Sequence, residues 1–476
     1  MKENALLEDL RNGKPLSFRK QLLLVISLAF PAIIAQLTSV VMQYIDAAMV
    51  GRLGAQKAAS IGLMSSTTWL VGGLYSALSM GYYVQVAHRI GAGEEKKARQ
   101  IVRHGLVIEL MFSAILLLVG LLVVRHLPIW LGGQGQIAVD STRYISVYAL
   151  GLPFLVLSYG AGGMLQSSGA MKTASFINIL MCVLDVIFNY FLIFPTREVS
   201  LSGIRLTMPG AGLDVMGASM GTVLSEVFGS LLMLYFLLIK SPMLHIRRDD
   251  IEGSGTPDLF GADFKKAITL AAPVALEQFI MGSAQVVITR IVAPLGAISI
   301  AANSFAITAE SFCYMPGFGI AYAGTTLIGQ SIGAGRQRLA ARFGWLVTFL
   351  GMILMGLAGV LLYAFSPQLM SILSPDPDII AMGTTVLRIE AFAEPLFGAA
   401  LVIAGVFRGS GDSLRPSVTN LISMWLIRIP LAIFLSTRIG LPGVWIAMCT
   451  ELCCRGTLLL IMLGLWGRKL KKSSSD

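Results

Sequence analysis

The tetrapeptide IGAG occurs twice in the chain, at Ile90–Gly93 and at Ile332–Gly335, 242 residues apart. Other matches share this offset: LAFP at Leu28–Pro31 with LAAP at Leu270–Pro273, LGA at Leu53–Ala55 with LGA at Leu295–Ala297, Gln36 with Gln278, Pro153 with Pro395, Gly169 with Gly411 and Asn178 with Asn420. Because one offset fits all seven matches, the chain contains two copies of one unit.

The composition excludes a water-soluble protein. Hydrophobic residues make up 55% of the 476 residues, charged residues make up 13%, and the mean hydropathy is +0.76. Soluble domains carry about 25% charged residues. The five cysteines lie in apolar runs without a CxxC pair, so the sequence indicates no metal site, redox motif or disulfide framework.

Twelve apolar segments are long enough to cross a bilayer, which takes about 20 residues each. We therefore predict an all-α membrane protein with twelve transmembrane helices in two pseudo-symmetric six-helix bundles. The predicted spans are 20–50, 57–88, 100–124, 139–166, 172–195, 212–239, 266–293, 299–331, 340–365, 380–407, 414–437 and 441–467.

The basic residues predict the orientation. With an even number of spans, 25 of the 36 Lys and Arg residues fall on the side of both termini, and 8 fall on the other side. The excess of positive charge marks the cytoplasmic side. We expect both termini in the cytoplasm, no cleavable signal peptide and a bacterial inner-membrane location. The net charge of +10 then reflects topology and not nucleic-acid binding.

Six spans per copy give the two copies the same orientation, related by an axis along the membrane normal. Two facing bundles suit alternating access, with a cavity between them near the middle of the membrane. The predicted divisions are a cytoplasmic N-terminal arm (1–19), a first bundle (20–240), a cytoplasmic linker (241–263), a second bundle (264–467) and a cytoplasmic tail (468–476).

Two aspartates interrupt the apolar runs. Insertion of a charged residue into the bilayer has a high free-energy cost, so such a residue is a candidate for function. Asp185 lies 13 residues after Lys172, about 20 Å into the membrane at 1.5 Å per residue. The equivalents of Asp46 and Asp185 in the second copy are Ile288 and Ile427. The scaffold therefore does not need either acid. The alternatives are an amide-satisfied buried Asp185 and a solvated Asp46 near the outer surface.

Further acids lie in the predicted spans, and Glu277, Glu390 and Glu394 stand out in the first and fourth spans of the second half. Structural ion pairs are the alternative for these acids, for example Glu394 with Arg428.

Several motifs resemble the multidrug and toxic compound extrusion (MATE) family. They are FPAIIAQL, IDAAMVGRLG, RIGAGEEKKAR, MLQSSGAMKTA and VLDVIF in the first half, and APVALEQ, SIGAGRQRLAAR and VFRGSGDSLRPS in the second. The resemblance covers about residues 20–465. It implies a secondary antiporter that exports organic cations and other amphipathic compounds in exchange for H⁺ or Na⁺.

The resemblance also implies site residues. In the DinF-like branch, aspartates in spans one and five and a threonine in span six form a cation-coupling site, and these match Asp46, Asp185 and Thr222. Asn178 stands one turn before the position of that branch's asparagine. The NorM-like branch places acids in spans seven and ten, so Glu277, Glu390 and Glu394 are a second candidate site. The substrate-cavity candidates are Gln36, Tyr44 and Gln278.

The expected mechanism is neutralisation of the acid pair. Burial disfavours ionised carboxylates, so Asp46 and Asp185 would take up H⁺ or Na⁺, and a two-state element such as span one around Pro31 would then switch. Small amphipathic or cationic molecules and the bilayer are the expected partners of a monomer. No enzyme activity, nucleic acid, cofactor or metal is expected, apart from the coupling ion.

The alternative function is a flippase for lipid-linked precursors, from the wider superfamily with the same twelve-helix plan. Such a protein would need cations in its cavity to hold pyrophosphate. Acids outnumber basic residues in the predicted spans, which favours cationic cargo.

Overall fold

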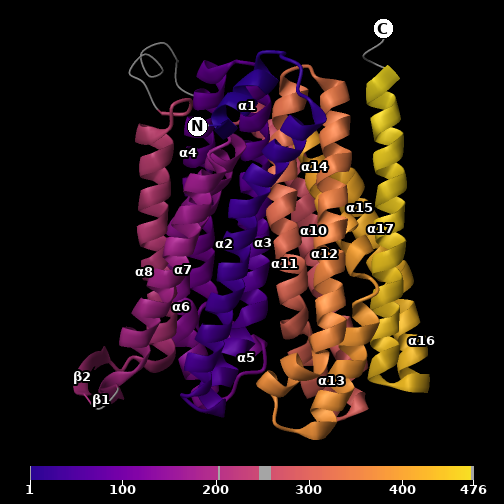
Figure 1. Ribbon diagram of the computed structural model, residues 1–476. Helices are drawn as coiled ribbons and strands as arrows, with labels where there is room; N and C mark the ends of the chain where they lie inside the picture. Colours follow the sequence, from indigo (N-terminus) through magenta and orange to yellow (C-terminus); the bar gives the residue numbers. More distant parts are fainter. Residues whose placement is uncertain (1, 202–203, 246–258, 473–476) are drawn as a thin grey trace.

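The computed structural model describes residues 2–201, 204–245 and 259–472, and its long helices stand side by side in two groups (Figure 1). The first group contains α1 (Lys2–Arg11), α2 (Phe18–Gly51), α3 (Ala55–Gly91), α4 (Glu95–Val123), α5 (Leu127–Trp130), α6 (Gly135–Ser167), α7 (Met171–Ile193), α8 (Asp214–Tyr235) and the π-helical turn η1 (Phe236–Lys240). The second contains α10 (Ala262–Val292), η2 (Ala293–Leu295), α11 (Ala297–Gly333), α12 (Gln337–Leu373), α13 (Pro377–Glu390), α14 (Glu394–Ser410), α15 (Leu414–Ser423), η3 (Met424–Arg428), α16 (Ile429–Ile439) and α17 (Leu441–Lys472).

The predicted twelve spans correspond to twelve long helical segments. Among the described residues, nine are long and apolar enough to cross a membrane, and the α13–α14 pair, bent by 60°, makes a tenth. The other two are α3 and α11, each 37 residues long but rich in Ser, Thr and Gly. Both lie near the centre of the molecule (Figure 1), and most of α11 and the second half of α3 are buried or half-buried. The fold prediction is therefore confirmed in outline.

Three local features differ from the predicted pattern. The predicted tenth span, 380–407, is not one helix, because the chain bends between Glu390 and Glu394. The eleventh contains a π-helical turn, η3. Between α7 and α8 an antiparallel hairpin forms from β1 (Pro195–Leu201) and β2 (Ile204–Ala211). Most of the predicted linker, and residues 473–476 of the predicted tail, lie outside the described residues.

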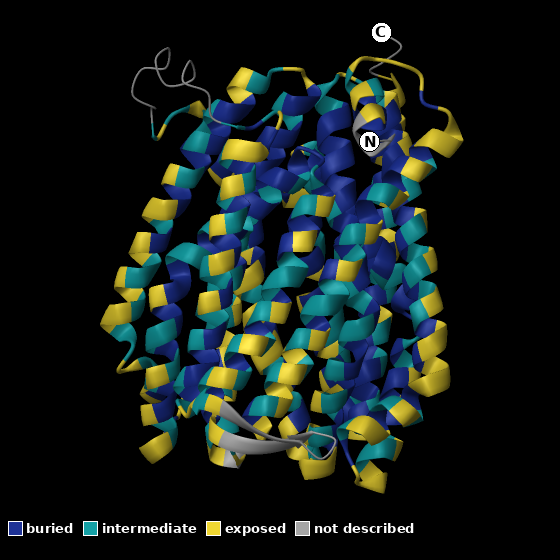
Figure 2. Cartoon of the chain, turned by 60° about the vertical axis from the view of Figure 1, so that its left-hand side comes forward, coloured by how far each residue is buried: buried dark blue, intermediate teal, exposed yellow. Residues whose placement is uncertain are grey.

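The outer surface of the helices is apolar, as a lipid-facing surface must be. Exposed residues run along the outward faces over the full length of the molecule (Figure 2). They include Leu122 at 70% exposure, Ile372 at 80% and Leu426 at 71%. The structure thus supports a multi-pass membrane protein.

The first helix of each half packs into the other half. Leu24 and Leu28 of α2 lie in one buried cluster with Phe343 of α12 and Phe407 of α14. Reciprocally, Leu270 of α10 belongs to the cluster of α3, α4 and α6. Each half therefore contributes its first helix to the hydrophobic core of the other half. The predicted division into 20–240 and 264–467 stays a prediction.

The repeated IGAG motifs explain how the halves meet. Each first glycine ends a central helix where the other helix crosses it: a Cβ at Gly91 of α3 would overlap the carbonyl oxygen of Gln330, and a Cβ at Gly333 of α11 would overlap that of His88. The later glycines, Gly93 and Gly335, have φ angles of +73° and +69°, which favour glycine. One glycine of each motif thus permits close contact and the other allows the turn.

The halves are closed against each other at the end that carries both chain termini, called here the terminal end (Figure 1). Gln330 Nε2 of α11 donates to the Ser167 carbonyl of α6 at 2.7 Å. His88 Nε2 of α3 lies 2.8 Å from the Gly409 carbonyl of α14. Toward the opposite end, called the distal end, a Cβ at Gly62 of α3 or Gly282 of α10 would meet nothing within 4 Å.

Helix α1 covers the closed terminal end. Leu7 and Leu10 are buried in the cluster that α2 shares with the second half. Arg11 donates from Nε to Gln330 Oε1 and from Nη2 to the Ser168 carbonyl, both at 3.2 Å. Since Ser168 and Gln330 belong to different halves, α1 ties the two halves together.

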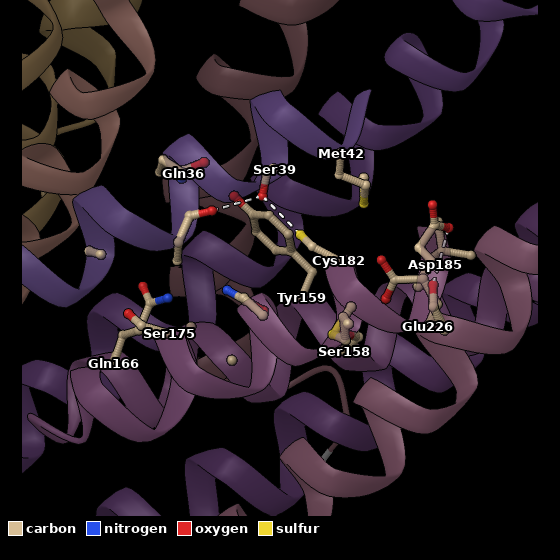
Figure 3. Close-up of a pocket in the computed structure, with 18 of the residues that line it drawn as sticks. Gln36, Ser39, Met42, Ser158, Tyr159, Gln166, Ser175, Cys182, Asp185 and Glu226 are labelled. Atoms are coloured by element: carbon tan, nitrogen blue, oxygen red, sulfur yellow. Dashed lines mark hydrogen bonds between the residues drawn. The ribbon is translucent and has the colours of Figure 1, made fainter. Parts of the chain in front are cut away.

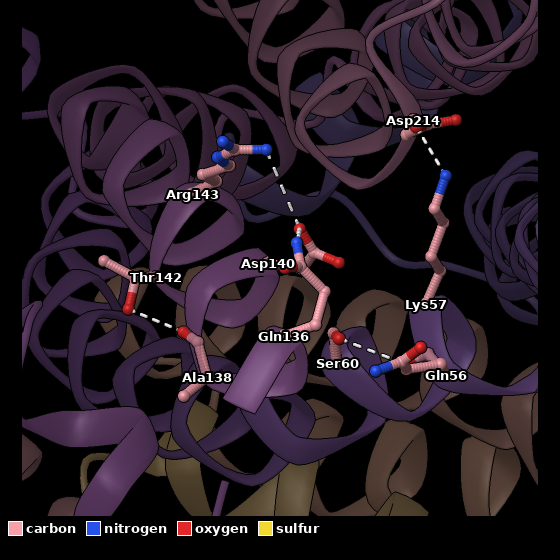
Figure 4. Close-up of polar contacts among 9 residues, drawn as sticks. All are labelled: Gln56, Lys57, Ser60, Gln136, Ala138, Asp140, Thr142, Arg143 and Asp214. Carbon is pink, nitrogen blue, oxygen red and sulfur yellow. Dashed lines mark hydrogen bonds and ion pairs between the residues drawn. The ribbon is translucent and has the colours of Figure 1, made fainter. Parts of the chain in front are cut away.

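At the distal end, polar contacts gather at the starts of α3, α6 and α8 of the first half (Figure 4). Lys57 of α3 pairs with Asp214 of α8 at 2.5 Å. Arg143 pairs with Asp140 at 3.8 Å at the start of α6. The Lys57–Asp214 pair joins α3 to α8, the Arg143–Asp140 pair stays within α6, and the Ser141 hydroxyl joins α6 to α3 by donating to the Ser60 carbonyl at 2.8 Å.

Candidate functional site

A cavity of about 280 Å³ lies in the first half, between α2, α3, α6, α7, α8 and one residue of α11. Figure 3 shows its lining, which contains polar, aromatic, acidic and sulfur-containing side chains. The lining residues include Gln36, Ser39, Tyr75, Tyr83, Tyr159, Gln166, Ser175, Asn178, Asp185, Thr222, Ser225, Glu226 and Tyr322. Among the described residues, the lining contains no Lys, Arg or His. The cavity is therefore an acidic, aromatic chamber.

Two aspartates and an asparagine form a polar cluster at the cavity wall. The Asn189 amide nitrogen donates to Asp46 Oδ1 and to Asp185 Oδ2, each at 2.9 Å. The two carboxyl oxygens are therefore no farther apart than the sum of these distances. Asp185 and Asn189 are each only 1% exposed, and Asp185 faces the cavity (Figure 3). Two acids from α2 and α7 thus meet within the membrane.

The helices position this cluster by simple spacing. Asp185 and Asn189 are four residues apart, so both lie on one face of α7. On α8, Gly221 leaves room for the amide, because a Cβ there would overlap Asn189 Oδ1. Among the described residues, Asn189 Oδ1 has no hydrogen-bond donor. This oxygen is therefore available to a cation, if the amide rotates.

The other predicted coupling residues lie near this cluster. Thr222 lines the cavity, and its hydroxyl donates to the Ala218 carbonyl at 3.2 Å. The Ser225 hydroxyl lies 3.4 Å from Asp185 Oδ1. Asn178 also lines the cavity, but the amide that joins the two aspartates belongs to Asn189, which the sequence analysis did not select. The i, i+4 spacing of Asp185 and Asn189 was the available signal.

The three predicted substrate-cavity residues occupy different places. Gln36 is in the cavity wall. Tyr44 packs against Phe312 of α11, with ring centroids 5.0 Å apart. Gln278 lies on α10 against Gly73 of α3, where an added Cβ would be 3.0 Å away. Tyr44 and Gln278 are therefore at the contact between the halves and not in the cavity lining.

Glu277, the first predicted acid of the second half, is held by a compact polar network. Its carboxylate accepts from the Ser417 hydroxyl and the Asn420 amide, both at 2.6 Å. Arg408 lies 3.7 Å away. These partners satisfy both oxygens of the carboxylate.

The repeat explains why the cavity lies in the first half. Ser417, Asn420 and Arg408 correspond to Ser175, Asn178 and Gln166, and Glu277 corresponds to Ala35. All four first-half residues line the cavity. Where the second half fills the space with a carboxylate and its partners, the first half has an alanine and leaves the space open.

Glu390 and Glu394 flank the bend between α13 and α14. Both are fully buried, and within the described residues neither carboxyl group has a hydrogen-bond donor. Glu310 of α11 is their acidic neighbour. The acidic neighbours of Arg428 are Glu451, Glu390 and Glu310, so the pair suggested for Glu394 and Arg428 does not form in the described part of the chain.

Comparison with known proteins agrees with this architecture. A sequence profile of the MatE family matches residues 31–191 and 273–434, which together are more than half of the chain and begin at the two equivalent prolines. A Thermotoga maritima protein called "Probable multidrug resistance protein NorM" is 26% identical over 458 residues, covering 95% of this chain and 94% of that protein. A protein with the same description from Chromobacterium violaceum is 26% identical over 451 residues, with 93% of both covered.

Solved structures share the fold. One is described as an outward-facing conformation of a multidrug resistance MATE family transporter; it has a TM-score of 0.85 at 20% identity, covering 94% of this chain and 96% of that one. A MOP superfamily transporter from Pyrococcus furiosus has a TM-score of 0.84 at 20% identity, covering 95% and 96%. Since the profile matches both repeats, this chain belongs to the MatE family, and it has the fold of the MATE transporters.

Proposed function

We propose that the protein is a secondary multidrug antiporter that exports cationic and amphipathic compounds in exchange for H⁺ or Na⁺. The observation that carries this proposal is the Asp46–Asn189–Asp185 cluster, which opens onto an acidic cavity through Asp185. The multidrug-resistance names of the relatives support the same function. The lining without cationic side chains does not suit the pyrophosphate that a flippase would hold.

The charge state of the acid cluster couples export of the substrate to entry of H⁺ or Na⁺. Two carboxylates close together repel each other in a medium of low dielectric constant. A proton shared between them removes this repulsion, and so does a Na⁺ ion held by both carboxylates and the amide oxygen of Asn189. Release of the ion restores the repulsion. The occupied and empty clusters thus favour different arrangements of α2 and α7.

The arrangement of the halves supports alternating access. In this structure they are closed at the terminal end, which we propose to be cytoplasmic from the excess of positive charge. Cysteines introduced at Ala55 and Gly261 test the orientation. Labelling of Ala55→Cys from outside and of Gly261→Cys from the cytoplasm is expected, and labelling of both from one side contradicts the topology. We also propose that the protein acts as a monomer, because one chain supplies the whole cavity.

Efflux measurements test the function. Ethidium export from cells or inverted vesicles is measured while the H⁺ and Na⁺ gradients are collapsed separately, and loss of export with one gradient identifies the coupling ion. Asp185→Asn and Asp46→Asn should reach the membrane normally but stop export, and Asp46→Glu should retain part of it. Export at the wild-type rate by both asparagine variants contradicts the proposal, whereas loss of Asp185→Asn from the membrane indicates a structural role.

A further inference from the structure

Glu226 is an acid of the cavity that the coupling cluster does not use. It lies on α8, one helical turn after Thr222, and shares the cavity wall with Asp185. Figure 3 shows both carboxyl groups at the same end of the cavity, on separate helices. Asp185 has the amide of Asn189 and the hydroxyl of Ser225 beside it. Ser158, in the same cavity wall, is a polar neighbour of Glu226.

A chain of tyrosines extends from Glu226 across the cavity. Glu226 and Tyr75 line the same cavity. The rings of Tyr75 and Tyr159 meet edge to face, with centroids 5.7 Å apart. The Tyr159 hydroxyl lies 3.4 Å from that of Tyr322 on α11, so the chain reaches from the first half to the second.

A carboxylate beside aromatic rings is suited to binding an organic cation. The faces of tyrosine rings attract cations, and a carboxylate supplies the opposite charge. Among the described residues, the lining has no basic side chain to pair with Glu226, so its carboxylate is open to a cation from outside the protein. The volume of about 280 Å³ is close to the lower end of ligand pockets, roughly 300–1,000 Å³.

We propose that Glu226, with Tyr75, Tyr159 and Tyr322, binds the positively charged head of the exported compound, a quaternary or protonated amine or a phosphonium. This inference rests on the proposed export function and assigns the substrate and the coupling ion to different acids. Glu226 holds the substrate cation, and the Asp46–Asn189–Asp185 cluster holds the coupling ion. Because Asp185 and Glu226 face one cavity, two bound cations repel each other, and binding of one favours release of the other.

The test is equilibrium binding of tetraphenylphosphonium to the purified full chain in lipid nanodiscs. This ion has a permanent charge, so pH changes only the protein. The affinity of Glu226→Gln should fall by about tenfold or more, the change expected for loss of one interaction with a charged group. Glu226→Asp should retain an intermediate affinity. A neutral compound of similar shape, triphenylphosphine oxide, should bind both variants like the wild type.

Glu109→Gln is the matched control. Glu109 is also a fully buried acid of the first half, but it lies against Gly160 and outside the cavity lining. Its replacement should leave tetraphenylphosphonium affinity unchanged. Asp185→Asn should still bind tetraphenylphosphonium, and at constant pH the competition by Na⁺ expected for the wild type should disappear, whereas competition by H⁺ at Glu226 itself should remain.

The outcomes separate the two proposals. If the wild type binds and exports tetraphenylphosphonium, and Glu226→Gln, eluting as a folded monodisperse protein, binds it equally well, the role of Glu226 is wrong and the export function stands. If the wild type neither binds nor exports organic cations, both proposals are wrong. A loss of affinity in Glu226→Gln that Glu226→Asp partly restores supports the proposal.

Discussion

The contact between α3 and α11 at the terminal end allows a sharp test of alternating access. Gly333 has no side chain where the His88 carbonyl of α3 lies, and Gly91 has none where the Gln330 carbonyl of α11 lies. Gly333→Ala adds one methyl group at this crossing. The new atom would lie inside 3.0 Å of a backbone oxygen, a distance that real Cβ atoms essentially never show.

The size of the effect follows from this geometry. Ordinary contact begins at 3.4 Å, so the helices must separate by more than about 1 Å, and overpacking of this kind costs about 1–3 kcal/mol. Alanine also favours a helix over glycine by about 0.5–1 kcal/mol, but this gain is present in every conformation and cancels. A change of 1–3 kcal/mol shifts a two-state equilibrium roughly 5- to 150-fold. Gly333→Ala should therefore favour opening at the terminal end.

Cysteine labelling measures this shift. In a background without the five native cysteines, Ser167→Cys places a thiol where Gln330 bridges the halves. A membrane-impermeant maleimide added from the terminal side should label it faster in Gly333→Ala and in Gly91→Ala, and ethidium export should fall. Gly62→Ala is the control on α3, because its Cβ would meet nothing within 4 Å. If Gly333→Ala is labelled and exports like Gly62→Ala, the reasoning is refuted.

Three further changes test other contacts. Asn189→Ala removes the amide shared by Asp46 and Asp185, so export should fall at least tenfold at normal expression, and unchanged export would show that the amide is dispensable. Arg11→Ala should increase labelling at the terminal end. Burial lowers the pKa of Arg11 only to about 10, so the residue stays charged and the effect of the substitution should be the same from pH 6 to 8. A strong pH dependence of the effect would contradict this. Lys57→Ala breaks a partly exposed ion pair, worth no more than about 1 kcal/mol, so thermal stability and export should stay near wild type, and a large loss would assign the pair another role.

The sequence predicted the features that depend on composition and repetition. Long apolar runs fix where helices cross the membrane, and the 242-residue offset predicts two equivalent halves. The same offset also identified Asp46 and Asp185 as unnecessary for the scaffold, and the structure brings them together. Their role as the coupling site, like the domain boundaries, stays a prediction.

Features that depend on packing between distant segments were not predicted. Asn189 follows Asp185 by one turn, but only the position of α2 shows that its amide also reaches Asp46. Tyr44 and Gln278 pack against the other half and do not line the described cavity, and their part in substrate binding stays a prediction. The bend between Glu390 and Glu394 interrupts an apolar run whose pattern predicts a single helix.

The exchange of first helices between the halves has a consequence for biosynthesis. Leu24 and Leu28 of α2 enter the membrane first, but their packing partners Phe343 and Phe407 are translated more than 300 residues later, a delay of about 16–77 s at 5–20 residues per second. Until then, the face of α2 that finally contacts α12 and α14 must be covered by lipid or by the insertion machinery. The first half cannot complete its own assembly, because α10 supplies part of its core. Both halves therefore mature together, and a ribosome that stalls after α8 leaves a bundle without its closing helix.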